Sequence, residues 1–361
     1  MTDPEQLRNH FPVLATRAYL NAGTEGPIPQ AAADAVQQRI TEDLAAGRSG
    51  MPYFQKVRGL AAEVRAGYAQ ALGASPSDVA LTSSTTFGVN TVVQGLRLGP
   101  GDEIITSDQE HPGVYLPLRL AKVRHRVRVK VVPFAQMPGE IGQNTKLIVC
   151  SHVSWVGGEV ADVGALVATG VPVLLDGAQA LGAIPLDVNA LGVDYYAGSG
   201  QKWMCGPEGS GALYVKRSRL DELEPPMPTY GTVSDSHDPF GSELTDGAAR
   251  FDDGFPTALR SVWAVASMGV LSGAGWEWAH ERAATLAITL ANELRERGLD
   301  VAPRGRSTLV SWKSTDPEGD VARLADAGII VRSIPSAGLL RASVGAWSSE
   351  DEINRLVSAV L

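Results

Sequence analysis

The stretch Gly198–Gly209, GSGQKWMCGPEG, places one lysine, Lys202, between two glycine-rich turns. The residues just before it, Tyr195–Ser199, are small and apolar, whereas a solvated surface lysine rarely has such neighbours. Further upstream, the apolar run Val171–Leu175 ends at Asp176. A lysine and an aspartate that both follow apolar segments are therefore candidate functional residues.

The order of these two residues suits a site for pyridoxal phosphate (PLP). In such a site a lysine forms a Schiff base with the cofactor, and an aspartate holds the pyridine nitrogen protonated. The order strand–Asp–spacer–Ser-Gly-x-Lys also resembles the fold-type I enzymes of the class V aminotransferase family, which includes cysteine desulfurases, selenocysteine lyases, kynureninases and isopenicillin N epimerases. The resemblance runs from about Tyr19 to about Leu356. It implies PLP as cofactor, a small amino-acid substrate and a homodimer.

Short apolar runs alternate with helix-like segments over the first two thirds of the chain, which is typical of a mostly parallel sheet covered by helices. The resemblance refines this α/β pattern to a fold-type I PLP transferase. It implies a large PLP-binding domain over 17–261, with a mostly parallel seven-stranded sheet, and a smaller α+β domain over 262–361 with 1–16. The expected strands of the large domain are Val79–Thr82, Glu103–Thr106, Val129–Pro133, Leu147–Cys150, Val171–Leu175, Tyr195–Ala197 and Gly211–Val215.

The remaining third has a different composition. Residues 221–257 are rich in proline and polar residues and predict a long loop-rich insertion. The alanine-rich segment Ala264–Arg297 predicts helix that stops near Gly298. Short strands and helices follow, and Ser349 is a good N-cap for a closing helix.

Composition limits the class of protein. Of 361 residues, 44% are hydrophobic and 20% charged, so a large core is possible and long disorder is not expected. The net charge of −9 argues against nucleic acid as a partner. No apolar run reaches membrane-spanning length, and the acidic N-terminus is no secretory signal. We therefore expect a soluble cytoplasmic protein, with no membrane partner and no metal site.

A candidate anion site lies at Ser83–Thr86, where a strand ends and a helix begins. Backbone N–H groups at a helix N-terminus, with hydroxyls beside them, favour a phosphate, although an ordinary Ser/Thr N-cap has the same pattern. The resembled family has paired threonines here, which implies that Thr85 and Thr86 bind the cofactor phosphate. Its lysine motif implies that Ser199 and Gln201 also contact the cofactor.

Three residues are candidates for contacts with the cofactor ring. Glu110-His111-Pro112 resembles the family's Glu-His motif, which implies that His111 stacks over the pyridine. Asp176-Gly177-Ala178-Gln179 resembles its Asp-x-x-Gln/His motif. This implies that Asp176 keeps the ring nitrogen charged and that Gln179 lies near the phenolic oxygen. Each assignment has a structural alternative: His111 could be an ordinary core or surface histidine with its hydrogen bonds satisfied, and Asp176 could cap a helix.

Substrate contacts are implied at two further places. Arg341, in the apolar strand Gly338–Ser343, resembles the arginine of the family's Arg-x-Ser segment, which pairs with the substrate α-carboxylate. Tyr19–Gly23 resembles an N-terminal turn, which places Asn21 and Ala22 near that carboxylate. The segment from Arg250 resembles a motif that reaches the partner subunit, but Phe255 stands where the family usually has threonine.

The chain departs from the desulfurases of the family in three places. Gln201 replaces the histidine of Ser-Gly-His-Lys, and Trp155 stands in place of an asparagine. The stretch Arg332–Gly338, where desulfurases carry a persulfide-forming cysteine, has none. Cys150 and Cys205 form no disulfide framework and are expected to be structural.

These residues together predict a PLP enzyme acting on an L-amino acid or its conjugate, with Lys202 as the base at Cα. The leading expectation is β-elimination of the C–S lyase type without a persulfide cysteine. Transamination, epimerisation and a non-catalytic scaffold remain alternatives.

Overall fold

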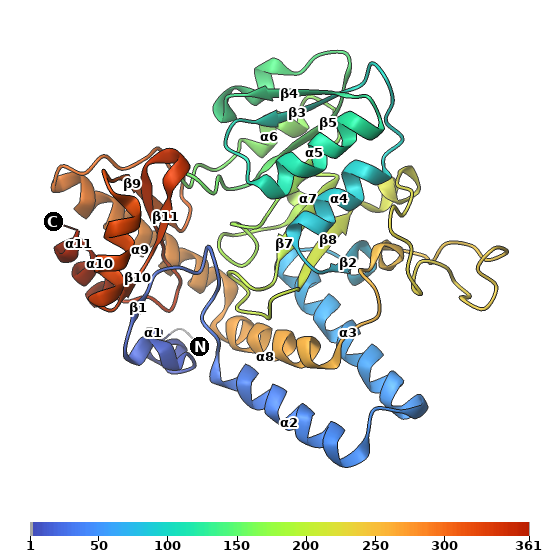
Figure 1. Ribbon diagram of the computed structural model, residues 1–361, viewed down its shortest axis with the longest axis horizontal. Helices are drawn as coiled ribbons and strands as arrows, with labels where there is room; N and C mark the ends of the chain where they lie inside the picture. Colours follow the sequence, from blue (N-terminus) through green and yellow to red (C-terminus); the bar gives the residue numbers. More distant parts are fainter. Residues whose placement is uncertain (1–2, 361) are drawn as a thin grey trace.

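The structure, a computed structural model, describes residues 3–360. Within them the central sheet has seven strands in the order β2-β8-β7-β6-β5-β3-β4 (Figure 1). All neighbours are parallel except that β8 runs antiparallel to β2 and β7. This confirms the predicted α/β fold with a mostly parallel seven-stranded sheet. The strands are β2 (Val79–Thr82), β3 (Glu103–Ser107), β4 (Arg128–Val132), β5 (Thr145–Ser151), β6 (Val173–Asp176), β7 (Tyr195–Ser199) and β8 (Gly211–Val215).

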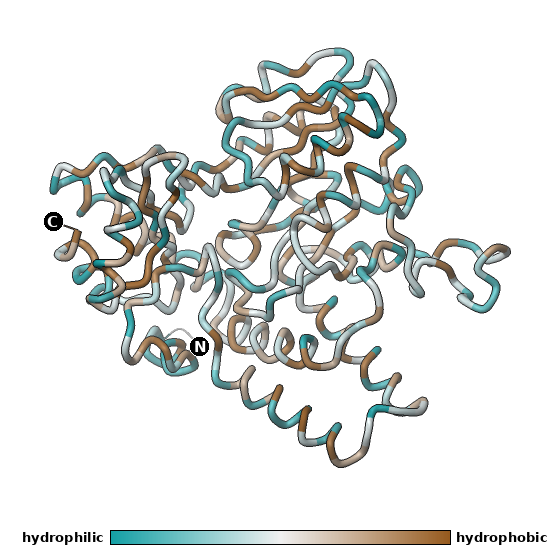
Figure 2. The backbone as a smooth tube through the Cα atoms, in the orientation of Figure 1, coloured by the Kyte–Doolittle hydropathy of each residue, from teal (hydrophilic) through white to brown (hydrophobic). Residues whose placement is uncertain are grey.

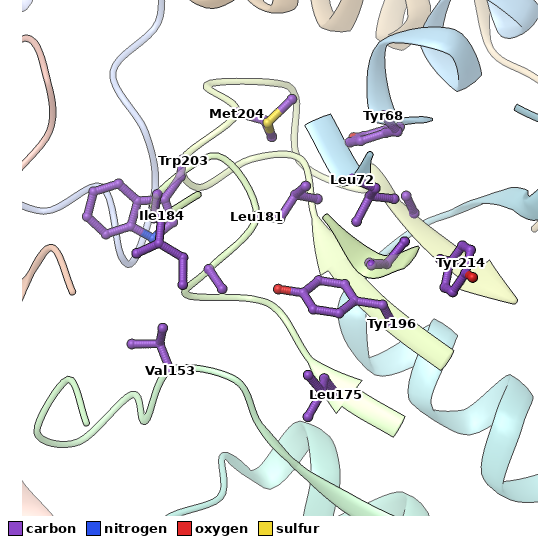
Figure 3. Close-up of a cluster of buried hydrophobic side chains, with 14 of the residues drawn as sticks. Tyr68, Leu72, Val153, Leu175, Leu181, Ile184, Tyr196, Trp203, Met204 and Tyr214 are labelled. Atoms are coloured by element: carbon purple, nitrogen blue, oxygen red, sulfur yellow. The ribbon is translucent and has the colours of Figure 1, made fainter. Parts of the chain in front are cut away.

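Helices cover both faces of this sheet, which is why its central strands are apolar throughout. On one face, Leu174 of β6 belongs to the same cluster as side chains of α4 (Thr85–Gly95) and α5 (Pro112–Arg124). On the other face, Leu175 belongs to a second cluster of buried hydrophobic side chains, part of which is shown in Figure 3. The helices of that second face are α3 (Gly50–Leu72), α6 (Val163–Val167), α7 (Val188–Leu191) and α8 (Ala258–Ala274).

Two long helices extend from this body. Helix α2 (Gln30–Ala46) packs on α8, and α3 follows it back toward the sheet (Figure 1). Hydrophobic and hydrophilic residues alternate along both helices (Figure 2), as expected for helices with one face on the protein. The chain between β8 and α8 is largely irregular and extends away from the sheet, as the sequence of 221–257 predicts.

The C-terminal part forms a three-stranded antiparallel sheet in the order β11-β12-β9. It comprises β9 (Leu309–Lys313), β11 (Arg332–Ile334) and β12 (Leu339–Ser343), with α9 (Trp276–Glu296), α10 (Pro317–Asp326) and α11 (Glu350–Ala359) packed around it. The predicted helix Ala264–Arg297 is divided, because Gly275 has φ of 87° and ends α8. The domain boundaries proposed above stay predictions.

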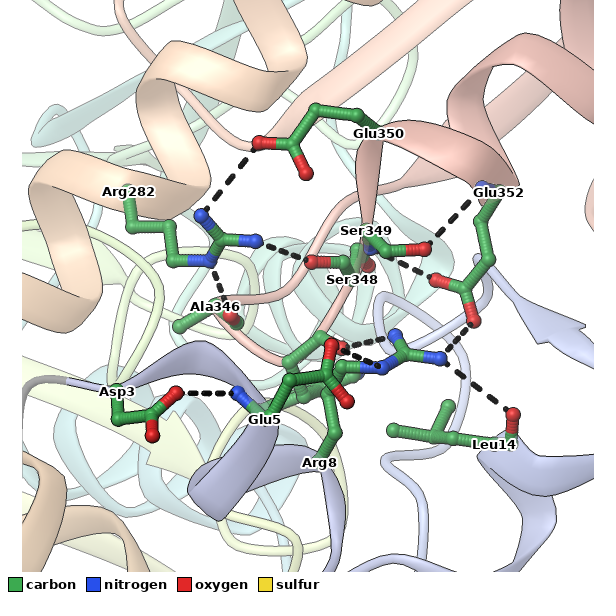
Figure 4. A network of polar contacts seen from close by, with 11 residues as sticks. Asp3, Glu5, Arg8, Leu14, Arg282, Ala346, Ser348, Ser349, Glu350 and Glu352 are labelled. Carbon is green, nitrogen blue, oxygen red and sulfur yellow. Dashed lines mark hydrogen bonds and ion pairs between the residues drawn. The ribbon is translucent and has the colours of Figure 1, made fainter.

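The N-terminal segment is fixed to this C-terminal part. β1 (Ala18–Tyr19) pairs with β10 (Ile329–Ile330). Arg8 of α1 (Pro4–Arg8) donates to the carbonyl of Trp347 (2.6 Å). It also donates to Glu352 (3.0 Å), as Figure 4 shows. The chain then crosses from the small sheet to the large one between β1 and α2, which brings residues 21–26 between the two sheets (Figure 1).

Short 3-10 helices complete the fold, at Pro12–Ala15, Pro76–Asp78, Phe134–Glu140, Arg217–Glu222, Ala248–Phe251 and Pro335–Ala337. None of the helices in residues 3–360 is both long and apolar enough to cross a membrane. In the same residues, no group of three or more His, Cys, Asp or Glu side chains is arranged to hold a metal ion.

Candidate active site

A cavity of about 230 Å³ lies at the carboxyl ends of the central parallel strands. Ser151 ends β5, Asp176 ends β6 and Ser199 ends β7, and all three line it. Ligands of open α/β sheets bind at this edge. The structure brings every residue predicted to bind the cofactor to this cavity: Thr85, Thr86, His111, Asp176, Gln179, Ser199, Gln201 and Lys202.

Lys202 and Asp176 are the two ionisable groups that the sequence places at the centre of the site. Burial lowers the pKa of Lys202 to about 8, although Asp176 opposes this shift. Burial also raises the pKa of Asp176, against a hydrogen bond from the Ala178 N–H (2.8 Å) and the charge of Lys202. A fraction of Lys202 is therefore an uncharged amine near neutral pH, which is the form that reacts with an aldehyde or accepts a proton.

Hydroxyls and backbone N–H groups meet at one end of the cavity. Ser84 caps α4 by accepting from the Phe87 N–H (3.1 Å), and the hydroxyls of Thr85 and Ser199 are 2.6 Å apart. The first N–H groups of a helix have no partner inside it, and they favour an anion. Gln201 also lines the cavity, and its side-chain amide carries an NH₂ group that can donate. Together these hydroxyl and N–H donors fit a phosphate group.

His111 lies at the mouth of the cavity, where it caps α5. Its Nδ1 accepts from the Gly113 N–H (3.0 Å), and its ring meets that of Trp155 edge to face at 5.1 Å. Although the side chain is exposed on one side, the surrounding protein lowers the pKa of His111 by desolvation. Lys202, Arg332 and Arg341 add repulsion. His111 is thus an uncharged ring at neutral pH.

Gln179 links the cavity to the N-terminal segment. Its Nε2 donates to the carbonyl of Gly23 (2.7 Å), and its Oε1 accepts from Trp203 Nε1 (3.1 Å). A Cβ added to Gly23 would lie 2.8 Å from Gln179 Oε1 and 3.1 Å from Arg341 Nη2. Glycine is therefore needed at residue 23, because the chain passes tightly between these two side chains.

Arg341 is fully buried next to Gly23 and does not line the cavity. Its Nη1 donates to the carbonyl of Trp155 (2.6 Å), but its Nε and Nη2 have no partner among residues 3–360. Burial, and then the charge of Arg332, lower the pKa of the Arg341 guanidinium. A buried cation with unpaired donors is costly, so the site is complete only with an anion beside it.

The predicted substrate residues do not line the cavity itself. Arg341 lies behind its wall, Asn21 forms a β-bridge with Ser343, and Ala22 is buried in the core. Asn21 contacts two residues that line the cavity: its side chain accepts from the Thr24 hydroxyl (2.8 Å), and its carbonyl accepts from the Glu25 N–H (3.2 Å). Asn21 and Ala22 therefore shape the wall through their backbone.

Sequence reasoning missed Thr24, Glu25 and Arg332, which line the cavity. Arg332 donates to the Thr24 hydroxyl (3.3 Å) and lies over the ring of Trp155, 5.9 Å from its centre. The sequence did carry one signal for it, a second arginine in the strand that precedes Arg341.

Neither cysteine lines the cavity. Cys150 and Cys205 are both buried free thiols, and burial raises the pKa of each far above its ordinary value. The carbonyl of Cys205 accepts from Trp263 Nε1 (3.0 Å) and from the hydroxyl of Ser267 (2.8 Å). These contacts anchor the lysine loop to α8.

Residues 18–356 match the Aminotransferase class-V family. The probable cysteine desulfurase of Methanothermobacter thermautotrophicus is 29% identical over 98% of this chain and 96% of its own length. The isopenicillin N epimerase of Amycolatopsis lactamdurans is 32% identical over 94% of each chain.

Solved structures with the same fold include two of C-DES. One is a mutant with glycine covalently linked to its PLP cofactor (TM-score 0.91, 26% identity, 97% of this chain and 98% of that one). The other is the cystine C–S lyase C-DES with its reaction product, cysteine persulfide (TM-score 0.90, 26% identity, 96% and 98%). The cysteine desulfurase CsdA of Escherichia coli is also similar (TM-score 0.87, 26% identity, 99% and 97%).

Proposed function

Because the chain belongs to the class V aminotransferase family of PLP-dependent enzymes, we propose that its cavity carries out β-elimination on an L-amino acid with sulfur at Cβ. The observation that supports this most is a cavity that contains Lys202 but no cysteine of the described chain. Elimination needs a base at Cα and a leaving group, whereas desulfuration needs a protein thiol to take up the sulfur.

The residues present fit the cofactor. Thr85, Thr86 and Ser199 would hold the phosphate at the start of α4, Asp176 would hold the ring nitrogen, and His111 would cover the ring. PLP, when bound, withdraws electrons from the substrate and so makes its Cα proton acidic.

Lys202 would act as the base at Cα. Its desolvated amine is partly uncharged near neutral pH, and a base whose pKa lies near the working pH transfers protons best. Asp176 remains close enough to favour the ammonium form once the proton has been taken.

Arg341 would orient the substrate. Its unpaired Nε and Nη2 present two donors in a fixed plane, which is the geometry that pairs with a carboxylate. A substrate α-carboxylate held there would supply the anion that this buried cation lacks.

Product analysis tests the reaction. Elimination releases the Cα proton and the sulfur group, and the resulting enamine hydrolyses to a keto acid and ammonia. We expect L-cystine and the holoenzyme to yield pyruvate and cysteine persulfide, both in wild type and in the double variant Cys150→Ser, Cys205→Ser. Alanine as product, with sulfur bound to the wild-type protein and lost in the double variant, would contradict the proposal.

Epimerisation is the second candidate, favoured by 32% identity to an isopenicillin N epimerase over 94% of the chain. A second acid on the opposite face of Cα is required for it. Appearance of the D-isomer of the substrate would favour this candidate over elimination, and formation of a keto acid only with an added amino acceptor would favour transamination.

We also propose a homodimer. Exposed apolar side chains gather where α2 and α3 meet the segment before α8, and the exposed rings of Phe54 and Phe255 contact each other edge to face at 5.9 Å. Clusters of exposed aromatic residues are typical of protein interfaces.

A further inference from the structure

Glu25 joins two cavities. It lines the inner cavity together with Lys202, and it also lines an outer groove between the N-terminal segment and α8. Of the described residues, Glu25 alone lines both. Glu25 therefore lies between the cavity that contains the lysine and the outer groove.

Backbone contacts hold Glu25 beside the lysine loop. The Gly26 N–H donates to the carbonyl of Gln201 (2.7 Å), and a Cβ added to Gly26 would lie 2.1 Å from the Lys202 carbonyl oxygen. On the other side, the Tyr19 hydroxyl donates to the carbonyl of Glu25 (3.0 Å). Only glycine allows this approach at residue 26, so the two chain segments are fixed against each other.

The Glu25 carboxylate forms no hydrogen bond or ion pair with any side chain in residues 3–360. Burial, and then the charge of Glu208, raise the pKa of Glu25 to about 6, while Lys202 opposes this. A carboxylate with such a pKa accepts and releases protons readily near neutral pH. The other titratable or charged groups of the inner cavity are His111, Asp176, Lys202 and Arg332, and those of the outer groove are Tyr19, Glu208 and Arg260.

We propose that Glu25 relays protons between Lys202 and the solvent of the outer groove. The inference rests on the proposed function, in which Lys202 removes the Cα proton. When the Cα–H bond breaks, the proton goes to Lys202 Nζ. Because the ammonium and the Glu25 carboxylate form no ion pair, a water molecule between them passes the proton to the carboxylate, and water in the groove takes it from the carboxyl group. Glu25 thus acts through Lys202 and does not contact the substrate.

Hydrogen exchange at Cα of L-alanine in D₂O isolates this step, because alanine has no leaving group at Cβ. We expect the wild-type holoenzyme to exchange the Cα hydrogen, measured by NMR, with a rate that falls as the pH drops through about 6 and the carboxylate is protonated. Glu25→Gln is expected to lower the rate at least about tenfold and to remove the part of the decline that is centred near pH 6, whereas the dependence on uncharged Lys202, whose pKa is about 8, remains. Glu25→Asp should recover part of the rate and part of the decline near pH 6. Unchanged visible absorbance of the bound cofactor verifies that each variant is loaded and folded.

Glu208→Gln is the matched control. Glu208 is exposed and lines only the outer groove, but its charge raises the pKa of Glu25. This variant is expected to keep the maximal exchange rate and to move the acidic decline to lower pH. A purely structural role of Glu25 would produce no such shift.

The outcomes separate the relay from the proposed function. Equal rates and equal pH profiles in wild type and Glu25→Gln overturn the relay alone. Absence of exchange in the wild type, or undiminished exchange in Lys202→Ala, overturns the role of Lys202 and the relay with it. Formation of D-alanine that is lost in Glu25→Gln also overturns the relay, because Glu25 then acts directly on the opposite face of Cα.

Discussion

Arg332 of β11 and Arg341 of β12 lie opposite each other in neighbouring antiparallel strands. Arg332 lines the cavity, whereas Arg341 is fully buried behind its wall. Trp155 contacts both arginines: Arg332 lies over its ring, and its carbonyl accepts a hydrogen bond from Arg341. Two arginines lie at this side of the cavity, and Arg341 has guanidinium N–H groups without a partner among residues 3–360. This positive charge suits the anionic substrate group of the proposed function.

Replacement of Arg341 tests the substrate contact. Arg341→Ala should raise KM for an α-amino acid much more than Arg341→Lys, because lysine keeps the charge but loses the planar pair of donors. The loss of a buried charged partner costs about 2–4 kcal/mol, which corresponds to roughly 30-fold or more in affinity. Steady-state kinetics measure this. Equal activity on substrates with and without an α-carboxylate would assign Arg341 another task.

Arg332 should contribute to the protonation state of Lys202 through its charge. Burial lowers the pKa of Lys202 most, and Arg341 and then Arg332 lower it further by repelling the ammonium form. Arg332→Gln removes this repulsion, raises that pKa and should move the pH midpoint for reconstitution of the apoprotein with PLP to higher pH, because the uncharged amine must react. Arg332→Lys keeps the charge and should keep the midpoint. A midpoint that is the same in Arg332→Gln as in wild type would refute the electrostatic role.

Asp176→Asn should leave PLP bound but lower turnover severely, by roughly a hundredfold or more. An asparagine cannot keep the pyridine nitrogen charged, so the ring draws electrons from the substrate poorly. Cofactor content by absorbance and turnover by product formation measure the two effects separately. A variant with full cofactor and nearly normal turnover would remove Asp176 from this role.

The proposed dimer predicts an effect of charge on the exposed aromatic pair. Phe255→Asp should increase the monomer fraction in light scattering, because each aromatic side chain buried at an interface removes a large apolar area from water. Leu116→Asp, on the exposed side of α5, is the matched control and should leave the association state unchanged. A wild-type protein that is monomeric at working concentrations would contradict the dimer.

Part of the proposed cofactor site could be predicted from the sequence, because several of its residues end a strand or begin a helix. Asp176 and Ser199 end β6 and β7, and Thr85 begins α4, so the apolar runs that predict these elements also place their polar ends at one edge of the sheet. Trp155 was noticed only as an unusual residue, and its contact with His111 depends on packing that no local pattern indicates.

Glu25 and Arg332 could not be found in this way. Glu25 reaches the site because Gly26 packs on the Lys202 carbonyl, a contact across 176 residues of chain. Arg332 reaches it through the strand register that sets it opposite Arg341. Both depend on long-range contacts rather than on local propensity or spacing. The break at Gly275 within the predicted helix Ala264–Arg297 could not be predicted for a different reason: a single glycine does not by itself end a helix.

The central claim is that Lys202 is the residue that binds the cofactor covalently and then serves as the base. Borohydride reduction of the PLP-loaded protein, followed by proteolysis and mass spectrometric peptide mapping, tests it most directly because the link becomes permanent where it exists. We predict a pyridoxyl label on Lys202 alone, and no stable label in Lys202→Ala. A label on a different lysine of the wild-type protein would contradict the account.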